Sequence, residues 1–512
     1  MHAASKPGTG LAGAGHEVLT EVAVAIDRTI AGGRASGRPQ PPSVGLEWAN
    51  RGRAAACFVL ALACQAEGPG RRAGAEPGLQ ANLAAATSAT SPADPAVSPA
   101  PLVPLQRPSE PLNVILITVE ALRADMPWSG YPRPIAPALT QLATESAVWK
   151  HQHSVSSHTP QAIATLLSGR YPSTLYRDGA FATSYAADNE FFPELLHAKG
   201  IRTIGVQAHE FFRKGKGFEQ GFDVWELVSG GEGAPGMDQA SSARSATRLI
   251  ELLGQPQNTG GQFFAWAHFM DPHEPYLAHP EVGDFGKQPR DLYDSEVAFT
   301  DHWLGQVLEF ARRQVWWKRT ALIVVGDHGE ALGEHGVPTH GADLWEVLLQ
   351  TPLLIRAPGA TSVQIEPARS HLDLAPTIVE LMGLPPPAAF QGQSLVAELY
   401  GAPAAPRPAL LFELCEDTQN PGWRALLTGD DKFMVPGAAN GPERLFHLTQ
   451  DPGELVNVAE KQPEKLREMA VRFEREFGRV PRIEPYGGMK LKSGRLAQGP
   501  EHPRSGAAPE KK

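Results

Sequence analysis

The chain has 512 residues and a formal net charge of -10, with both signs of charge mixed along its length. This length allows two or more domains around a large core, and the charge balance gives no basic footprint for nucleic acid. The three cysteines, Cys57, Cys64 and Cys415, are too few and too scattered for a disulfide framework or a thiolate zinc site.

The first 110 residues are predicted to contain an export signal and a linker, and no folded domain. Within residues 51–64, two arginines precede an apolar run that ends in Leu-Ala-Leu-Ala-Cys. This order is typical of a signal peptide, and its end resembles a bacterial lipoprotein cleavage box with Cys64 as the lipidated residue. A short apolar helix in an unstructured leader is the alternative. Residues 65–110, rich in Ala, Pro and Ser, predict a disordered linker. The expected product is an exported periplasmic or outer-envelope lipoprotein of a bacterium, held to the membrane only through Cys64.

Two apolar runs after residue 110 are each followed by residues of the types that bind metals. The run from Val114 to Val119 predicts a strand covered on both faces, as in an α/β sheet, and Glu120 follows it directly. The run from Leu322 to Val325 is followed closely by Asp327 and His328. If the two strands are parallel neighbours, these side chains converge at the edge where open α/β sheets bind ligands. A helix-terminal charge at Glu120 and a polar turn at Asp327 are the alternatives.

A candidate nucleophile lies between these strands. Thr159 followed by Pro160 is typical of a helix start, with the threonine as N-cap, and Gly169 is the predicted end of that helix. A hydroxyl there lies at the positive end of the helix dipole, which favours an alkoxide or a bound oxyanion. The alternative is that Thr159 only caps the helix. Spacing alone does not rank it against its neighbours Ser156, Ser157 and His158.

Further elements and side chains are predicted along the chain. A strand is predicted from Phe263 to Ala267, with His268 packed in the core and His273 in a functional loop at the strand's end. Residues 294–313 predict an amphipathic helix, and residues 488–512 a disordered tail. Arg170 directly follows the predicted helix end, where it could bind an anion or a site carboxylate, or form a structural salt bridge.

Three segments resemble, in this order, the sulfatase family of the alkaline phosphatase superfamily. They are NVILITVEALRAD from residue 113, HTPQAIATLLSGRYP from residue 158 and VVGDHGEALGEHG from residue 324. Similar segments follow, such as FFAWAHFMDPHEPY, HLDLAPTIVELMGL and RLFHLTQDPGELVN, so the resemblance covers about residues 111–475. It implies an α/β/α sandwich with a large central mixed sheet in a catalytic domain (111–395), and a smaller C-terminal α+β subdomain (396–487).

The resemblance also implies a role for individual residues. Glu120, Asp327 and His328 fall on the family's metal positions, which implies one divalent ion: Ca, Mg or Mn, with Zn also compatible. Thr159 falls where sulfatases carry the Cys or Ser that is converted to formylglycine.

Three histidines complete the implied site. His209 and His273 fall near the family's substrate-contacting histidines. His340 lies near a position often held by a sulfate-binding lysine.

The departures from the family pattern define the expected mechanism. The modification signal needs Cys or Ser, then Pro two residues on and Arg four residues on, whereas this chain has Thr159, Gln161 and Ile163. Formylglycine is therefore not expected. The Glu, Thr and Asp-His set resembles the lipoteichoic acid synthase and phosphoethanolamine transferase branch, whose nucleophile is a threonine.

Three hypotheses about function follow. The first, which we expect, is a metal-dependent hydrolase that cleaves a sulfuric or phosphoric ester of a small molecule, glycan or lipid through Thr159. The second is a phosphoglycerol or phosphoethanolamine-type transferase that acts on envelope glycans or lipids. The third is a non-catalytic metal-binding homologue.

Overall fold

The computed structural model describes residues 107–228, 241–437 and 441–500. The expected signal at residues 51–64 and nearly all of the expected linker lie outside the described residues. Within the described ranges, no helix has the length and apolar character needed to cross a bilayer. The chain keeps a defined structure past residue 488, where a disordered tail was expected to begin. Lys490 bridges Leu496 in antiparallel fashion, and Leu491 and Ala497 are buried.

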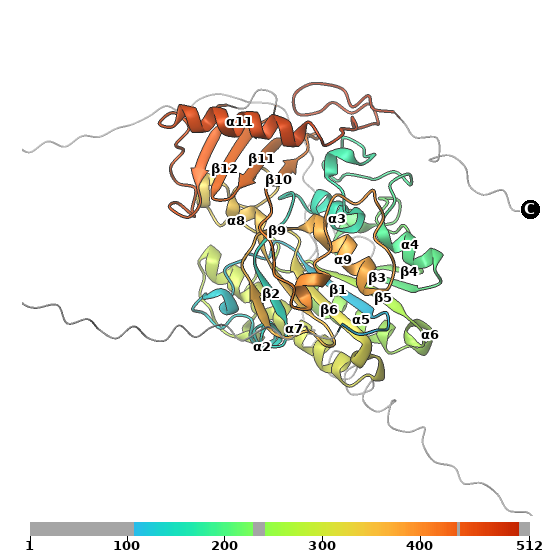
Figure 1. The fold of residues 1–512 in the computed structure, drawn as a ribbon. Coiled ribbons are helices and arrows are strands. Elements are labelled where there is room, and N and C mark those ends of the chain that lie inside the picture. Colours follow the sequence, from blue (N-terminus) through green and yellow to red (C-terminus); the bar gives the residue numbers. More distant parts are fainter. Residues whose placement is uncertain (1–106, 229–240, 438–440, 501–512) are drawn as a thin grey trace, which may run out of the picture. The chain divides into compact units, whose positions relative to one another are not determined.

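A large mixed sheet forms the centre of the structure (Figure 1). Across this sheet lie β4 (Val224–Leu227), β3 (Arg202–Gln207), β5 (Phe263–Phe269), β1 (Asn113–Val119), β6 (Thr320–Gly326), β7 (Gln350–Arg356), β2 (Ala147–His153) and β8 (Val363–Ile365), and β9 (Arg369–Ser370) pairs with β2. Neighbours from β4 to β6 are parallel, and β7 runs antiparallel to β6 and β2. The strand predictions at β1, β5 and β6 are confirmed.

Helices cover both faces of this sheet because its strands are apolar on both sides. One face packs against α3 (Thr159–Ser168), α4 (Phe192–Ala198) and α9 (Leu374–Leu381), the other against α2 (Pro137–Ala143), α5 (Ser242–Leu253) and α7 (Pro289–Arg312). Along β1, Val114 and Leu116 face the first set, and Ile115 and Ile117 face the second. The predicted α/β/α sandwich is confirmed.

Short elements connect this framework. The short α-helices are α6 (Pro256–Thr259), α8 (Glu346–Leu349) and α10 (Val396–Leu399). The 3-10 helices are η2 (Pro127–Ser129), η3 (Pro172–Thr174), η4 (Glu210–Phe212), η5 (Pro280–Val282), η6 (Val315–Arg319), η7 (Glu334–Gly336) and η8 (His371–Asp373).

A second, smaller sheet follows in the sequence. Its antiparallel strands are β10 (Leu410–Leu414), β11 (Trp423–Thr428), β12 (Asp431–Pro436) and β13 (Arg444–His447), and α11 (Pro463–Phe477) packs on it through Met469 and Phe473 (Figure 1). Val396 and Leu399 of α10 still belong to the core of the large sheet. The core of the large sheet thus includes α10, and the strands of the small sheet begin with β10.

Candidate active site

The ends of β1 and β6 bring two carboxylates together. These strands are parallel neighbours with Val119 opposite Gly326, so Glu120 and Asp327 leave the sheet side by side. The backbone N–H of Asp327 donates to the Val119 carbonyl at 3.1 Å, and that of Glu120 donates to the Phe269 carbonyl on β5 at 2.9 Å. Both acidic side chains are fully buried. The predicted convergence at the carboxyl edge of the sheet is confirmed.

Thr159 reaches this pair from the first turn of α3. The helix begins at Thr159, with His158 as its N-cap, so the expected capping role of the threonine is wrong. Its Oγ1 instead donates to Glu120 Oε1 at 2.6 Å and lies 3.1 Å from His328 Nε2. The predicted helix end at Gly169 is confirmed, because this residue has a left-handed conformation with φ 62°.

Asp327 and His328 present ligand atoms in the manner of a metal site. Asp327 Oδ1 accepts the backbone N–H groups of Ala121 (2.9 Å) and His328 (2.7 Å), while its buried Oδ2 has no hydrogen-bond partner among the described residues. His328 Nδ1 donates to the Gly329 carbonyl at 2.9 Å, so Nε2 is the ring nitrogen that faces the site, and a bound cation would take the place of its proton. One ligand atom from each of Glu120, Asp327 and His328 lies within 4.8 Å of the others. Oxygen and imidazole donors with an unpartnered buried carboxylate oxygen fit a divalent cation.

Strong electrostatic coupling links these three groups. Burial alone would raise the pKa of Glu120, but hydrogen bonds from His268 and His328 hold it well below its usual range. Burial and the neighbouring Glu120 charge raise the pKa of Asp327 to about 6. Burial opposes the charging of His328, yet Asp327 and Glu120 raise its pKa to about 10. The cluster thus concentrates negative charge that a cation would neutralise.

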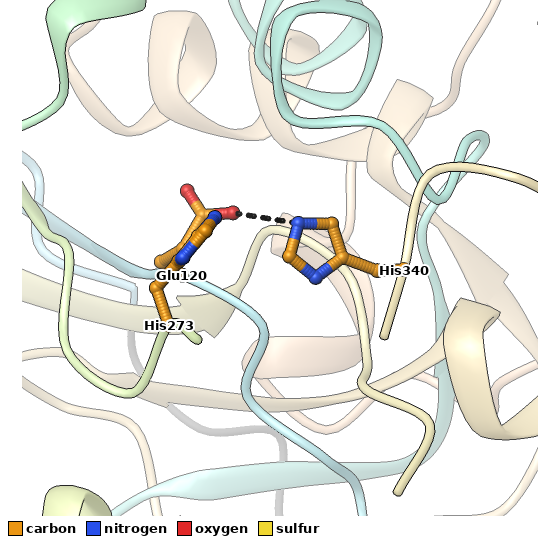
Figure 2. Close-up of side chains that lie close together, drawn as sticks. All are labelled: Glu120, His273 and His340. Atoms are coloured by element: carbon orange, nitrogen blue, oxygen red, sulfur yellow. Dashed lines mark ion pairs between the residues drawn. The ribbon is translucent and has the colours of Figure 1, made fainter. Parts of the chain in front are cut away.

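The three predicted histidines line one side of the cluster. His340 Nε2 lies 3.9 Å from Glu120 Oε1, and its ring centre lies 4.4 Å from that of His328 and 5.0 Å from that of His273. Figure 2 shows Glu120, His273 and His340 gathered at this point. His209 lies next to His273, with a distance of 5.9 Å between the two ring centres. All three lie in the same site as the carboxylates.

Burial keeps His209 and His273 neutral. His209 Nδ1 accepts the Phe211 backbone N–H at 3.0 Å, so its Nε2 carries the proton in the neutral ring. Burial lowers the pKa of His209 to about 3, which keeps this ring neutral at pH 7. Burial and His340 also lower the pKa of His273. The site therefore holds neutral imidazoles beside its anionic groups.

His268 is buried in the core, as expected, and it also contacts the site. Its Nε2 lies 2.9 Å from Glu120 Oε2, and its Nδ1 lies 2.8 Å from Thr118 Oγ1. Trp266 Nε1 donates to the same Thr118 Oγ1 at 2.9 Å. A neutral His268 that donates to Glu120 must accept at Nδ1, so a relay runs from Trp266 through Thr118 and His268 to Glu120.

Comparison with known proteins places this site in a family. Residues 112–384 match the family model described as Sulfatase, and residues 333–477 match that described as N-sulphoglucosamine sulphohydrolase, C-terminal. The first match alone covers more than half of the chain. The chain belongs to the sulfatase family.

Relatives of this sulfatase-family chain include enzymes of different specificity. Mouse (Mus musculus) arylsulfatase K is 30% identical over 188 residues, 35% of this chain and 34% of that protein. A choline-sulfatase of Rhizobium meliloti is 30% identical over 178 residues, 34% of each chain. The match thus spans about a third of the length of these curated relatives. The structure of a phosphonate monoester hydrolase from Silicibacter pomeroyi has a TM-score of 0.60 at 19% identity, over 72% of this chain and 96% of that chain, which shows a shared fold.

Arg170 does not join the sulfatase-family site. Its Nη2 donates to the Thr174 carbonyl at 2.5 Å, within its own segment of chain. Among the described residues, this guanidinium thus makes a hydrogen bond to the backbone and not the salt bridge that was the structural alternative.

Glu330, which sequence reasoning did not assign, is part of the site's support. This buried carboxylate lies 3.1 and 3.2 Å from His340 Nδ1 and fixes that ring. Its place three residues after Asp327, in a turn rich in glycine, was the only sequence signal for it.

Aromatic rings border the site near Thr159. The buried His158 ring lies 4.6 Å from the half-buried Phe181 ring, centre to centre, and the Phe211 ring lies 4.1 Å from the His209 ring at a tilt of 36°. Phe181 and Phe211 contact each other edge to face at 6.0 Å. These rings form an apolar border next to the polar residues of the site.

Proposed function

We propose that this protein hydrolyses a sulfuric or phosphoric ester with Thr159 as its nucleophile. The observation that supports this most directly is the buried Thr159 Oγ1, 2.6 Å from Glu120 Oε1 and 3.1 Å from His328 Nε2. A threonine that served only to cap α3 would direct its oxygen at the helix backbone. Family membership supports the same reaction class, because the named relatives are sulfatases.

A divalent ion held by Glu120, Asp327 and His328 would lower the pKa of a coordinated hydroxyl and polarise an ester oxygen. The chain's own residues orient the reaction around it. Glu120 Oε1 accepts the hydrogen bond of Thr159 and aims the hydroxyl lone pair at the sulfur or phosphorus. The neutral His209 offers Nε2–H to the developing negative charge on an ester oxygen.

The covalent threonine ester then has to be resolved. Thr159 has one hydroxyl, whereas the hydrated aldehyde of formylglycine has a second that expels sulfate. A water must therefore attack the sulfur or phosphorus of the adduct and release Thr159 as an alcohol. An acceptor hydroxyl could attack in the same way, and this chemistry of Thr159 supports transfer to an envelope glycan or lipid as a second candidate function.

Activity assays on the full chain supplied with Zn²⁺, Mn²⁺ or Ca²⁺ test the proposal. The substrates are an aryl sulfate, an aryl phosphate monoester and an aryl phosphodiester, with and without glycerol as acceptor. We expect turnover of at least one ester that is lost after chelation and in Thr159→Ala. Release of the aryl group only when glycerol is present would favour the transferase.

A trapping experiment identifies the nucleophile itself. Rapid acid quenching followed by peptide mass spectrometry should find a sulfated or phosphorylated peptide that contains Thr159. Thr159→Ser keeps the hydroxyl and should form the same adduct, whereas Thr159→Ala should not. Full activity in Thr159→Ala would instead indicate attack by a bound water.

We also propose that the protein acts in the bacterial envelope, anchored at Cys64. The order of charged, apolar and cysteine residues in segment 51–64 supports this, although it lies outside the described residues. Metabolic labelling with an alkyne fatty acid should mark the wild-type chain and not Cys64→Ser. An unlabelled wild-type chain would contradict the anchor.

A further inference from the structure

We propose that Glu120, His273 and His340 form a second divalent-cation site beside the first, with Glu120 as the shared ligand. The site itself stands on the geometry below, and only its catalytic consequence rests on the proposed ester hydrolysis. The ion classes that fit are zinc and manganese.

The three side chains already lie at ligand spacing. One ligand atom from each of Glu120, His273 and His340 lies within 4.8 Å of the others, and Figure 2 shows both rings beside the carboxylate. His340 Nε2 lies 3.9 Å from Glu120 Oε1, which is too long for a direct hydrogen bond. Two ligands of one tetrahedral ion, each at ~2.0–2.2 Å, lie about 3.4 Å apart, so a few tenths of an ångström close this gap.

Both histidines are oriented as metal ligands. His340 Nδ1 faces the Glu330 carboxylate at 3.1 Å, and His273 Nδ1 faces the Glu274 carbonyl at 2.5 Å. Because an acceptor fixes the proton on each Nδ1, each Nε2 keeps its lone pair for the site. Metal-bound histidines in proteins are held in this way, with the second ring nitrogen donating to a carboxylate or a carbonyl.

Glu120 is placed to serve both ions. Its Oε2 accepts from His268 at 2.9 Å, and its Oε1, which accepts from Thr159 at 2.6 Å, is the oxygen that faces the site. That oxygen lies 3.2 Å from His328 Nε2 on one side and 3.9 Å from His340 Nε2 on the other. A single carboxylate oxygen between two sets of ligands is the arrangement of a bridging ligand.

The donor set indicates the ion. Two histidines and one carboxylate, with a position left open, form a ligand set that catalytic zinc uses, and manganese accepts the same donors. Calcium prefers six or more oxygen ligands and fits this trio poorly.

A second ion would bear on the substrate of the proposed reaction. Two dications match a dianionic phosphoric monoester better than a monoanionic sulfuric ester, because the phosphoric ester brings more negative charge to the same site. Removal of the second ion should therefore lower phosphoric ester turnover more than sulfuric ester turnover.

Metal stoichiometry tests the site without any assay of activity. The full chain is stripped with chelator, dialysed against Zn²⁺ or, separately, Mn²⁺, and its bound metal is measured by mass spectrometry. We expect two ions per chain in the wild type and one in His340→Gln, His273→Gln or Asp327→Asn. His302→Gln, an exposed histidine on α7, is the matched control and should keep two. One ion in the wild type at saturating metal would overturn the proposal.

Electron paramagnetic resonance of the Mn²⁺-loaded protein adds a readout that folding alone does not change. Two ions that share Glu120 should give a spin-coupled spectrum, which becomes the six-line spectrum of an isolated ion in His340→Gln. Two coupled ions without turnover of any ester would support this site while contradicting the proposed hydrolase. Ester turnover with only an isolated ion in the wild type would do the reverse.

Discussion

At the scale of single residues, the relay behind Glu120 decides how well the site can hold a cation. His268 donates to Glu120 Oε2 and is itself fixed by Thr118 and Trp266. We predict that His268→Phe lowers the affinity for the metal by 10–100-fold, because the carboxylate loses the partner that orients it. Competition with a fluorescent zinc chelator measures this affinity. An unchanged affinity in His268→Phe, relative to the His302→Gln control, would limit His268 to packing.

A second residue-scale prediction concerns acid stability. Burial lowers the pKa of His371 to about 3, so the folded protein keeps this ring neutral while the unfolded chain protonates it below about pH 6.5. The unfolded state then binds more protons, and this contribution to stability is lost as the pH falls from 6.5 towards 3. From pH 7.5 to pH 5.0 the loss from this one group is about 2 kcal/mol.

Urea unfolding of His371→Gln at the two pH values checks this contribution. The variant should lose about 2 kcal/mol less than the wild type over this interval, because glutamine does not titrate. Other groups titrate in both proteins, so the difference between the two proteins is the quantity that matters. An equal loss in both would show that His371 does not stay neutral in the fold.

Much of the site could be predicted from the positions of its residues relative to the apolar strands. Glu120, Asp327 and His328 directly follow apolar strands, so the sequence indicates the edge of the sheet at which they lie, and the parallel pairing of β1 with β6 then brings them together. The role of His268 was not recognised because it lies inside an apolar strand, where a histidine is usually packed. Its function depends on the neighbour relation between β5 and β1, which places it opposite Thr118, and a single sequence does not specify this pairing.

At the scale of elements, the helix that presents Thr159 depends on how it ends. Gly169 stops α3 with φ 62°, and a Cβ there would lie 3.0 Å from the Phe390 ring and 3.2 Å from Ala375 Cβ. We predict that Gly169→Ala destabilises the fold by about 1–3 kcal/mol, since both the left-handed backbone and the close packing oppose a side chain.

Urea unfolding measures the stability of Gly169→Ala, and Gly261→Ala is the matched control. Gly261→Ala adds a Cβ that meets no atom of the described residues within 4 Å and has no left-handed backbone to strain, so it should change stability by less than about 0.5 kcal/mol. Equal stabilities for the two variants would contradict the role assigned to the end of α3.

The elements themselves were more predictable than the loops between them. Apolar runs and helix stop signals specified β1, β5, β6 and α3 to within a few residues, because burial and backbone preference act locally. His209, His273 and His340 lie after strand ends on irregular segments. Only contacts with distant groups, such as that of His340 with Glu330, fix these rings, so their distances could not be derived from the sequence.

At the scale of the whole described domain, a buried cation ties the small sheet to the large one. Lys432 of β12 is fully buried and lies 2.9 Å from carboxylates of both Glu346 of α8 and Glu454. Glu346 also lies 2.9 Å from His153 Nε2 at the end of β2. The ammonium group compensates two buried carboxylates that would otherwise oppose the docking of the two sheets.

Removal of this lysine should therefore loosen the join between the sheets. We predict that Lys432→Met lowers the free energy of unfolding at pH 8 by about 3–5 kcal/mol, because Glu454 is left as a buried carboxylate without a cation and Glu346 keeps only His153 as its partner. Lys465→Met is the matched control, because Lys465 lies on α11, which packs on the same small sheet. Lys465 is partly exposed beside Asp431, and its loss should cost less than about 1 kcal/mol. Equal effects of the two changes would show that the buried cluster does not hold the sheets together.

The pH dependence of the Lys432→Met effect separates charge from packing. Burial and Glu346 already raise the pKa of Glu454, to about 7 even with Lys432 present. Without the lysine, the folded carboxylates bind protons more tightly than the unfolded chain does, so the stability of the variant falls as the pH rises through their folded pKa values. The deficit relative to wild type should thus be smaller at pH 5.5 than at pH 8. Adding Glu346→Gln and Glu454→Gln should remove most of this pH dependence, whereas a deficit caused by lost packing would be the same at both pH values.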